Sequence, residues 1–167
     1  MNKEDLLALW KGINWEKHDS GIYFLGRYLN KDINIYFTGY CEQDLVLLSD
    51  DLMTSLYRNL EHLDKKAQKV IHDNWPDKAV TELELRELIL DKSSSYGEFA
   101  LGYDAGVSPA GSLYLLVKFD KYFQADRELV YEIYWLSDNE RLKSGDEMKD
   151  LYKAMLGLNG IVLVTIC

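Results

Sequence analysis

Hydrophobic and polar positions follow two different periods along this chain, and each period predicts one kind of element. Over residues 21–29 and 32–40, aromatic and β-branched residues alternate with other residues on both sides of an Asn30-Lys31 connection. A period of two predicts strands, and two such runs joined by a short connection predict a β-hairpin. The register of this hairpin depends on which of its two faces enters the core.

A helical period begins after the polar run 49–51 and continues almost to Pro76. Serine and aspartate are common caps of helix N-termini, and the apolar residues behind them recur at i, i+3 and i+4. The pattern predicts one long central helix, with a break near Asp64 as an open alternative. The same period recurs over 3–11 and 145–156 and predicts two shorter helices near the ends of the chain.

Residues 81–90 fit two kinds of element. Thr81 and Glu84 have the spacing of a helix capping box, whereas alternate leucine and isoleucine positions, interrupted at Glu87, fit a strand. We favour the strand, because the serine-rich turn that follows leads into another β-rich run.

Three further β-rich runs, over 99–103, 112–119 and 129–135, predict a meander of antiparallel strands. A connecting loop is expected over 106–111, where glycine and proline occur, and a terminal strand over 161–166. Together these elements predict an α+β fold, in which a mainly antiparallel sheet packs with a long central helix and terminal helices.

Composition agrees with one domain spanning residues 1–167. Hydrophobic residues make up 47% of the chain and aromatic residues 13%, which is enough apolar material for one core without metal or disulfide staples. No repeat, low-complexity tract or interdomain linker interrupts the pattern. We therefore expect a single α+β domain.

Acidic residues outnumber basic ones by 28 to 19, which gives a net charge of −9. Such a charge repels phosphate backbones, so direct nucleic-acid binding is not expected. The same field speeds association with a basic protein, and salt weakens that effect. High net charge also keeps proteins soluble, which is the plainer explanation of the same number.

The first residues lack the pattern of a secretory signal, and no apolar run approaches the roughly 18 residues of a membrane span. Cys41 and Cys167 are isolated thiols without CxxC spacing, which fits a reducing compartment. We expect a cytoplasmic protein that does not insert into a membrane.

The search for catalytic, metal-binding and cofactor-binding motifs finds none that is specific. His18, His62 and His72 form neither HExxH nor an i, i+4 pair, and nothing beside Cys41 in sequence would activate its thiol. The glycines of 97–111 form neither GxGxxG nor a P-loop. We predict no catalytic, metal or cofactor residues and no enzymatic activity.

One enzymatic alternative remains open. Asp104 and Asp120 fall at the ends of adjacent predicted strands, where two carboxylates could bind a cation or act as a glycosidase-type pair. Strand-ending aspartates ordinarily form turns, which is the favoured interpretation. With His18, these residues would be the candidates for an unrecognised hydrolase.

A partner-binding surface is predicted on the run 129–135, where aromatic and acidic residues occur together. If this run is extended, Glu132 and Tyr134 share one strand face and Glu128 lies near its start. Acidic groups around aromatic side chains suit recognition of a basic protein. The alternative is that Tyr134 belongs to the core and that the two glutamates are merely solvated.

The segments YGEFALGYDAG, LYLLVKFD and ELVYEIYW, preceded by a long amphipathic helix, resemble the small acidic immunity proteins of bacterial polymorphic-toxin and contact-dependent growth inhibition systems. The resemblance covers mainly residues 50–135. It implies a non-enzymatic cytoplasmic antidote that binds a cognate toxin domain, for example a nuclease, and blocks its active site or substrate access. It assigns no residue a role, and a protein-binding scaffold or regulatory module remains an alternative.

Overall fold

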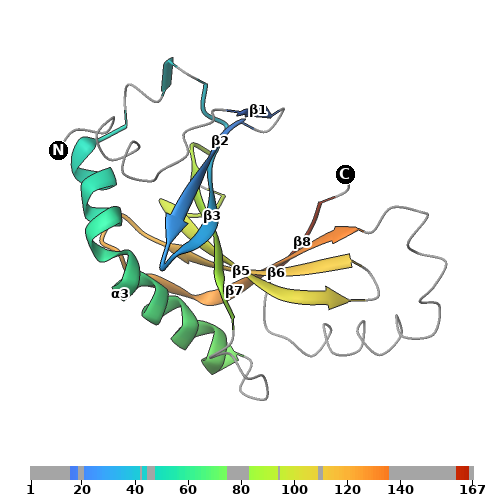
Figure 1. Ribbon diagram of the computed structural model, residues 1–167. Coiled ribbons are helices and arrows are strands. Elements are labelled where there is room, and N and C mark those ends of the chain that lie inside the picture. The colour runs from blue at the N-terminus through green and yellow to red at the C-terminus, as the bar shows by residue number, and fades with distance from the viewer. Residues whose placement is uncertain are drawn as a thin grey trace.

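The computed structural model describes residues 16–18, 21–41, 43–44, 48–74, 83–93, 95–108, 111–135 and 161–165. Within these residues, one long helix and eight strands are formed (Figure 1). Their bounds are β1 Glu16–His18, β2 Gly21–Tyr28, β3 Lys31–Thr38, α3 Asp50–Asn74, β4 Leu85–Asp91, β5 Phe99–Ser108, β6 Gly111–Phe119, β7 Ala125–Trp135 and β8 Ile161–Thr165. The terminal helices predicted over 3–11 and 145–156 lie outside the described residues.

The eight strands form one sheet whose spatial order is the order of the chain, from β1 to β8. Neighbouring strands are antiparallel except for the pairs β3–β4 and β7–β8, which are parallel. A parallel pair needs a crossover connection, and between β3 and β4 this connection contains α3. The α+β class and the meander from β4 to β7 are confirmed, as is the predicted terminal strand, which is β8.

The predicted N-terminal hairpin is formed by β2 and β3. Its two-residue turn is Leu29-Asn30, one position before the predicted connection, and both residues have positive φ angles of 47° and 65°. This backbone is typical of hairpin turns that match the right-handed strand twist. The alternation in β3 is also confirmed, because its buried apolar residues are Ile33, Ile35 and Phe37.

The central helix α3 is continuous over Asp50–Asn74, so the alternative of a break near Asp64 is wrong. Ser49 caps its start, since the Ser49 hydroxyl accepts a hydrogen bond from the Leu52 amide at 3.3 Å. Asp64 itself is buried. Its burial inside the helix is explained by hydrogen bonds from the sheet.

Two tyrosine hydroxyls of the sheet donate hydrogen bonds to the Asp64 carboxylate. The Tyr103 hydroxyl, on β5, donates to Asp64 Oδ1 at 2.7 Å, and the Tyr28 hydroxyl, on β2, donates to Asp64 Oδ2 at 3.1 Å. Buried carboxylates are tolerated when their lone pairs are satisfied in this way. Asp64 therefore ties α3 to two strands that are far apart in the sheet.

Helix α3 lies along one side of the sheet, and most of the buried apolar residues lie between them (Figure 1). A smaller buried cluster contains no α3 residue and alternates with the main core along β4 to β7, so it lies on the opposite side, which we call the second face. Its members are Ile89, Ala100, Leu116 and Val130, with Tyr36 and Tyr96 packed against them.

Of two predictions in the meander, the strand over 81–90 is confirmed and the loop over 106–111 is largely wrong. The preference for a strand over 81–90 is confirmed by β4, although 81 and 82 lie outside the described residues. The loop predicted over 106–111 is largely wrong, because β5 extends to Ser108 and β6 begins at Gly111. A register shift between Asp104 and Val107 accommodates Gly106, whose φ of +96° favours glycine.

Candidate functional site

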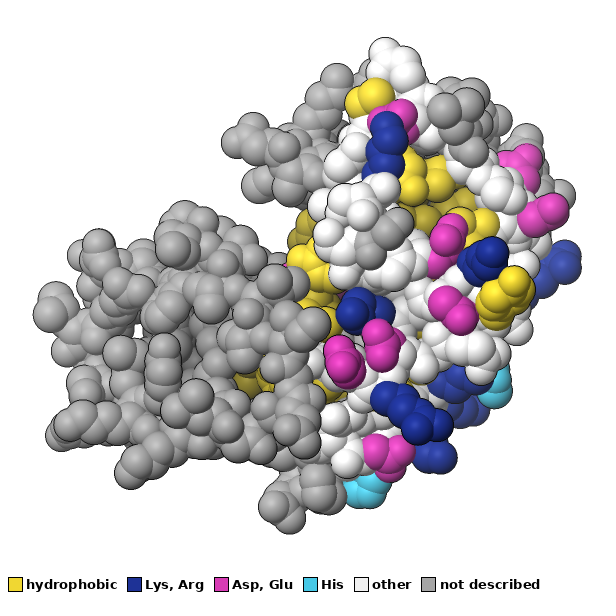
Figure 2. Space-filling view, turned by 180° about the vertical axis from the view of Figure 1, so that it is seen from behind, with side chains coloured by type: hydrophobic (Ala, Val, Ile, Leu, Met, Phe, Trp, Pro, Cys, Tyr) yellow, Lys and Arg dark blue, Asp and Glu magenta, His cyan; other side chains and the backbone are white. Residues whose placement is uncertain are grey.

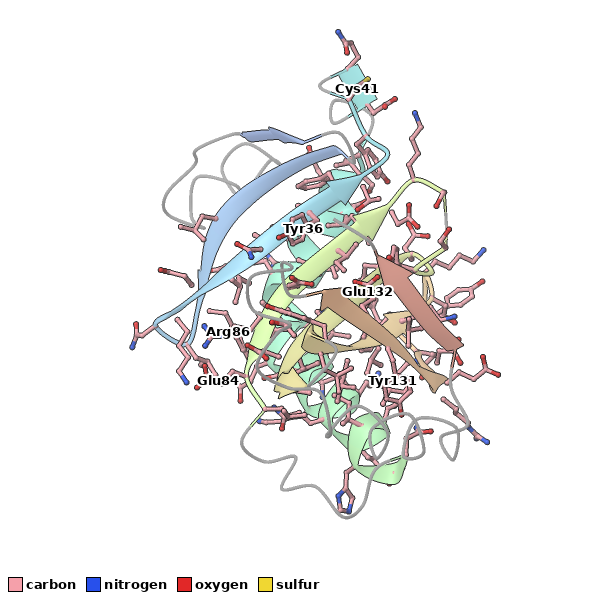
Figure 3. The ribbon with its side chains drawn as sticks, turned by 90° about the vertical axis from the view of Figure 1, so that its right-hand side faces the viewer. Tyr36, Cys41, Glu84, Arg86, Tyr131 and Glu132 are labelled. Carbon is pink, nitrogen blue, oxygen red and sulfur yellow. The ribbon has the colours of Figure 1, made fainter. Side chains whose placement is uncertain are left out.

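The three residues predicted to bind a partner all lie on β7 but in different surroundings. Glu128 is exposed, whereas Glu132 is only 2% exposed. Figure 3 shows Glu132 over the sheet, and the side chain of Tyr134 lies outside the described part of the structure. Glu128 and Glu132 therefore do not form one exposed surface, and Glu132 is not a solvated residue of an acidic rim.

Glu128 is exposed because β7 contains extra residues at its start. Val117 of β6 pairs with Leu129 and Phe119 pairs with Ala125, so two steps on β6 correspond to four on β7. Such a bulge takes residues out of the ladder. Inside it, the Asp126 carboxylate accepts a hydrogen bond from the Glu128 amide at 3.1 Å, which replaces a missing backbone acceptor.

The turn before this bulge is also held by a carboxylate. Asp120 Oδ1 accepts hydrogen bonds from the backbone amides of Tyr122 at 2.8 Å and Gln124 at 2.9 Å. The Tyr122 side chain is 69% exposed, and the ammonium of Lys121 lies 5.2 Å from the centre of its ring. We call residues 120–128 the hairpin tip: an ordered segment with one exposed aromatic side chain, that of Tyr122, and three exposed acidic ones.

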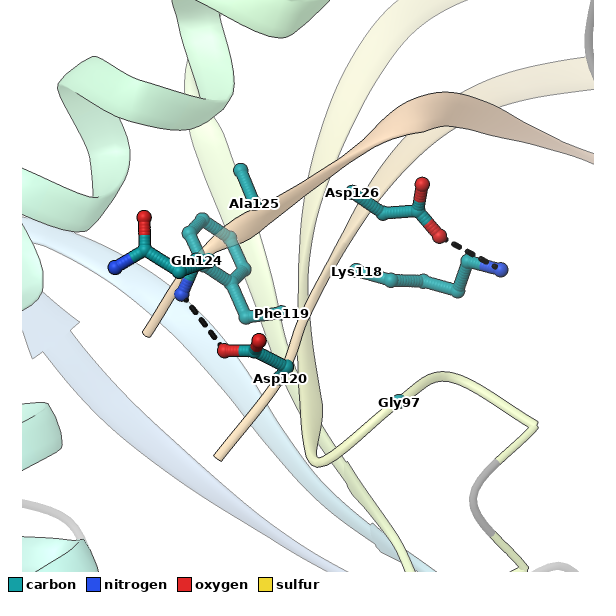
Figure 4. Close-up of a pocket in the computed structure, with 7 residues that line it drawn as sticks. All are labelled: Gly97, Lys118, Phe119, Asp120, Gln124, Ala125 and Asp126. Atoms are coloured by element: carbon teal, nitrogen blue, oxygen red, sulfur yellow. Dashed lines mark hydrogen bonds and ion pairs between the residues drawn. The ribbon is translucent and has the colours of Figure 1, made fainter. Parts of the chain in front are cut away.

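A hollow of about 360 Å³ adjoins the hairpin tip (Figure 4). Its wall includes the ion pair between Lys118 Nζ and Asp126 Oδ2, which are 3.4 Å apart. Gly97, with a φ of +75°, closes one side, and a Cβ at this position would lie 2.6 Å from the carbonyl oxygen of Phe119. The hollow is lined by Gly97, Lys118, Phe119, Asp120, Gln124, Ala125 and Asp126.

Asp104 and Asp120, the carboxylates considered for catalysis, are not brought together. Asp104 pairs with Tyr114, five residues before the end of β6 at Phe119, whereas Asp120 directly follows that end. Each makes a local turn contact instead, since Asp104 Oδ1 accepts a hydrogen bond from the Gly106 amide at 2.8 Å. The interpretation as a turn residue is confirmed for Asp120, whereas Asp104 lies inside β5, next to the register shift, and does not end the strand. The His18 side chain lies outside the described residues.

The sequence analysis missed a pair of buried carboxylates on the second face. Glu87 of β4 is 4% exposed and Glu132 of β7 is 2% exposed. Glu87 Oε2 accepts no hydrogen bond from any described residue. The glycine opposite Glu87 makes room for it, because a Cβ on Gly102 would lie 3.0 Å from Glu87 Oε2 and 2.9 Å from a methyl group of Leu116. We call Glu87 and Glu132 the buried pair.

Burial dominates the electrostatics of the buried pair. Desolvation, followed by the negative charges of Glu132 and Asp104, raises the pKa of Glu87 to about 7. The Tyr96 hydroxyl donates a hydrogen bond to Glu132 Oε1. Desolvation and this bond raise the pKa of Tyr96, and desolvation with the charges of Glu87 and Asp104 raises that of Tyr114. The charged groups that act on these three side chains are mainly carboxylates, with Arg86 opposing them at Tyr114.

A signal for the buried pair was present in the sequence. Glu87 interrupts an otherwise apolar strand pattern, and Glu132 lies inside the apolar and aromatic run 129–135. Pattern alone does not show that both positions fall on the same face of one sheet, since that depends on the register of four strands.

The remaining titratable residues considered for a site are Asp91, which has a structural role in a turn, and two histidines on α3. Asp91 is buried, and its carboxylate accepts hydrogen bonds from the Ser93 hydroxyl and the Tyr96 amide, which fixes the turn after β4. His62 and His72 are exposed on α3.

Among the described residues, no three His, Cys, Asp or Glu side chains are arranged to hold a metal ion. None of the described helices is long and apolar enough to cross a membrane.

Comparison of the chain with protein-family models, with curated proteins and with solved structures found no match.

Proposed function

We propose that this protein is a non-enzymatic immunity protein, which binds and neutralises a cognate basic toxin domain of bacterial origin. The observation that carries the proposal is the hairpin tip. It presents an exposed tyrosine beside exposed carboxylates, those of Asp120, Asp126 and Glu128. Aromatic side chains with rigid bodies and polar ends are frequent anchors of protein interfaces.

The order of the hairpin tip supports this role. Its conformation is fixed by two hydrogen bonds to Asp120 and one to Asp126, so little conformational entropy is lost when a partner binds. The adjoining hollow offers a recess for a side chain of the partner. A stable interface buries roughly 1,200–2,000 Å² in total, so surface next to the tip must also take part.

Net charge supports a basic partner in a different way. Figure 2 shows acidic and basic side chains interspersed over the described surface on one side of the molecule. On this side the described charges do not gather into one acidic patch, whereas the net charge of −9 contributes a long-range field. Such a field speeds the encounter with a basic protein, while contacts such as those of Tyr122 determine how long the complex lasts.

The direct test in cells is co-expression with the product of the neighbouring upstream gene. We expect this protein to protect cells from that toxin and to copurify with it. Failure to protect cells and to form a complex with any adjacent toxin would overturn the proposal.

A matched pair of variants tests the surface. Tyr122→Ala, on the hairpin tip, is expected to increase the dissociation rate of the complex at least tenfold, because interface aromatics contribute most of their energy after docking. Tyr57→Ala, on α3, is the control, since Tyr57 is also exposed but lies away from the tip. Equal dissociation rates for the two folded variants would exclude the tip as an interface centre.

A further inference from the structure

No cation among the described residues offsets the charge of Glu87. Glu87 Oε2 is buried and accepts no hydrogen bond within the described part of the chain. The charges that act most strongly on Glu87, those of Glu132 and Asp104, are both negative. A buried carboxyl group in such surroundings either holds a proton or binds a cation.

The surroundings of Glu87 are shaped by the strands between the two carboxylates. Glu87 pairs across the sheet with Gly102 of β5, and Gly102 pairs with Leu116 of β6. Gly102 has no side chain, so the Glu87 carboxylate and Leu116 lie directly over it. On the second face, the surface between β4 and β7 is therefore apolar, with Glu87 on one side of it and Glu132 on the other.

Half-buried aromatic and polar side chains separate the buried pair from solvent. Tyr96 extends over the apolar cluster, and its hydroxyl bonds to Glu132. Asp104 and Tyr114 form the adjacent row, which leads across the sheet to Glu132. Tyr96, Tyr114 and Asp104 are only partly buried, so a ligand could displace their side chains without breaking a strand pairing.

We propose that Glu87 and Glu132 together receive the guanidinium group of one arginine side chain from the partner protein. This inference rests on the proposed function and names the partner group that the second face recognises. On binding, the guanidinium replaces the proton of Glu87, which is released to solvent. The site therefore gains the positive charge of the guanidinium and loses that of the proton, so its net charge is unchanged.

The geometry favours a guanidinium over other cations. A metal ion would need several ligands at short distance, and no such set exists among the described residues. The buried pair comes from strands separated by β5 and β6, so the ligand has to reach two carboxylates in different directions. A planar guanidinium has five donors and stacks on aromatic rings such as that of Tyr96, whereas an ammonium group is a compact point charge.

Proton exchange gives the binding a characteristic pH dependence. Below about pH 7, where Glu87 is protonated, each unit of pH increase should strengthen binding about tenfold, and above it the affinity should level off. The titratable groups that face Glu87 are Tyr96 of the turn after β4, Asp104 of β5, Tyr114 of β6 and Glu132 of β7.

The test uses the purified whole protein and N-acetyl-arginine amide as the probe. Binding is followed by NMR of the Glu87 side-chain carboxyl carbon at pH 6, 7 and 8. We expect a saturable shift that strengthens with pH as described. Glu87→Gln should weaken probe binding at least tenfold and abolish its pH dependence, whereas Glu61→Gln, a matched change on the exposed side of α3, should leave both unchanged.

Several results would overturn the inference. One is a Glu87 signal that titrates but does not respond to the probe, which would make the buried pair a proton site only. Equal binding of N-acetyl-lysine amide, or competition by Mg²⁺, would contradict a guanidinium site. The NMR signal of the unmodified protein decides this even if Glu87→Gln does not fold.

The test does not depend on the toxin. A negative probe experiment would overturn the arginine site and leave the immunity function in place. Failure of protection in cells would overturn the proposed function while the probe experiment still reports on the site.

Discussion

At the residue scale, this protein buries carboxyl groups in two different ways. Asp64 is surrounded by donors, from Tyr28, Tyr103 and Gln68. Among the described residues, Glu87 has no donor for Oε2 and two negative neighbours. The first arrangement satisfies the hydrogen-bonding capacity of a buried carboxyl group and stabilises the fold around it. The second arrangement raises the pKa of Glu87, so the stability that this residue contributes should depend on pH.

For Glu87, we predict that the folded state loses stability as pH rises. Its pKa of about 7 lies above the ordinary value of 4.5, so the folded protein binds this proton more tightly than the unfolded chain. The stabilisation is complete below pH 4.5 and is lost between about 4.5 and 7. Glu87→Gln should remove up to roughly 3 kcal/mol of this dependence, at 1.36 kcal/mol for each pKa unit.

Urea unfolding of both proteins at pH 5 and pH 8 measures this effect. Other titrating groups are common to the two proteins, so the difference isolates Glu87. A free energy of unfolding that falls equally in both proteins would contradict the assignment.

For Asp64, we predict a large loss of stability on removal of the carboxylate. Asp64→Ala leaves the buried Tyr103 hydroxyl without its acceptor at 2.7 Å and should lower the free energy of unfolding by roughly 3 kcal/mol. Asp73→Ala, on the exposed side of the same helix, should stay within about 0.5 kcal/mol of the original protein. Similar unfolding midpoints for the two variants would show that the network contributes little.

At the element scale, the hairpin tip and the turn beside it are held by backbone contacts. The Glu98 amide donates to the Phe119 carbonyl at 2.8 Å, next to the close approach of Gly97. The bulge at the start of β7 then exposes Glu128. The candidate interface is therefore made of turns whose geometry depends on the ends of β5, β6 and β7.

Two glycines in this meander provide a matched stability test. Both have positive φ angles, but a Cβ on Gly97 would clash with the Phe119 carbonyl, whereas a Cβ on Gly106 would meet nothing within 4 Å. Gly106→Ala should cost about 1 kcal/mol through backbone strain alone, and Gly97→Ala clearly more. Thermal unfolding that ranks the two variants in the opposite order would contradict this description of the turn.

For Glu128, we predict an effect on the rate of complex formation. Glu128→Lys reverses an exposed charge at the hairpin tip and should slow association with a basic partner severalfold at low salt, with little change in dissociation. Glu61→Lys makes the same charge change on α3 and is the control. Surface plasmon resonance at two salt concentrations measures both rates, and equal slowing by the two variants would leave only the net charge as the cause.

The elements also show how far local pattern reaches. Alternation predicted β2 and β3, and helical spacing predicted α3, because these patterns record one buried face each. The loop predicted over 106–111 was largely wrong, since Gly106 forms a bulge inside a long hairpin and does not end it. Single-sequence patterns do not distinguish a bulge glycine from a loop glycine.

At the scale of the whole molecule, the arrangement of strands determines what the sequence could not reveal. The parallel pairs β3–β4 and β7–β8 leave no pattern in the residues that form them. The buried pair is created by the register of β4 to β7, so Glu132 could be placed on a strand face with Tyr134 but not recognised as buried beside Glu87. Net charge and the acidic and aromatic residues of the run 129–135 favoured a basic partner, and that expectation remains a prediction.

The central claim, that this protein neutralises a toxin by binding and not by catalysis, is tested most directly with purified components. The activity of the toxin encoded by the neighbouring gene is titrated with increasing amounts of this protein. We predict that activity falls linearly to zero at a fixed molar ratio and returns when the two proteins are separated. Loss of activity at far less than stoichiometric amounts, or a toxin that stays inactive after separation, would show that this protein acts as an enzyme on the toxin and would contradict the claim.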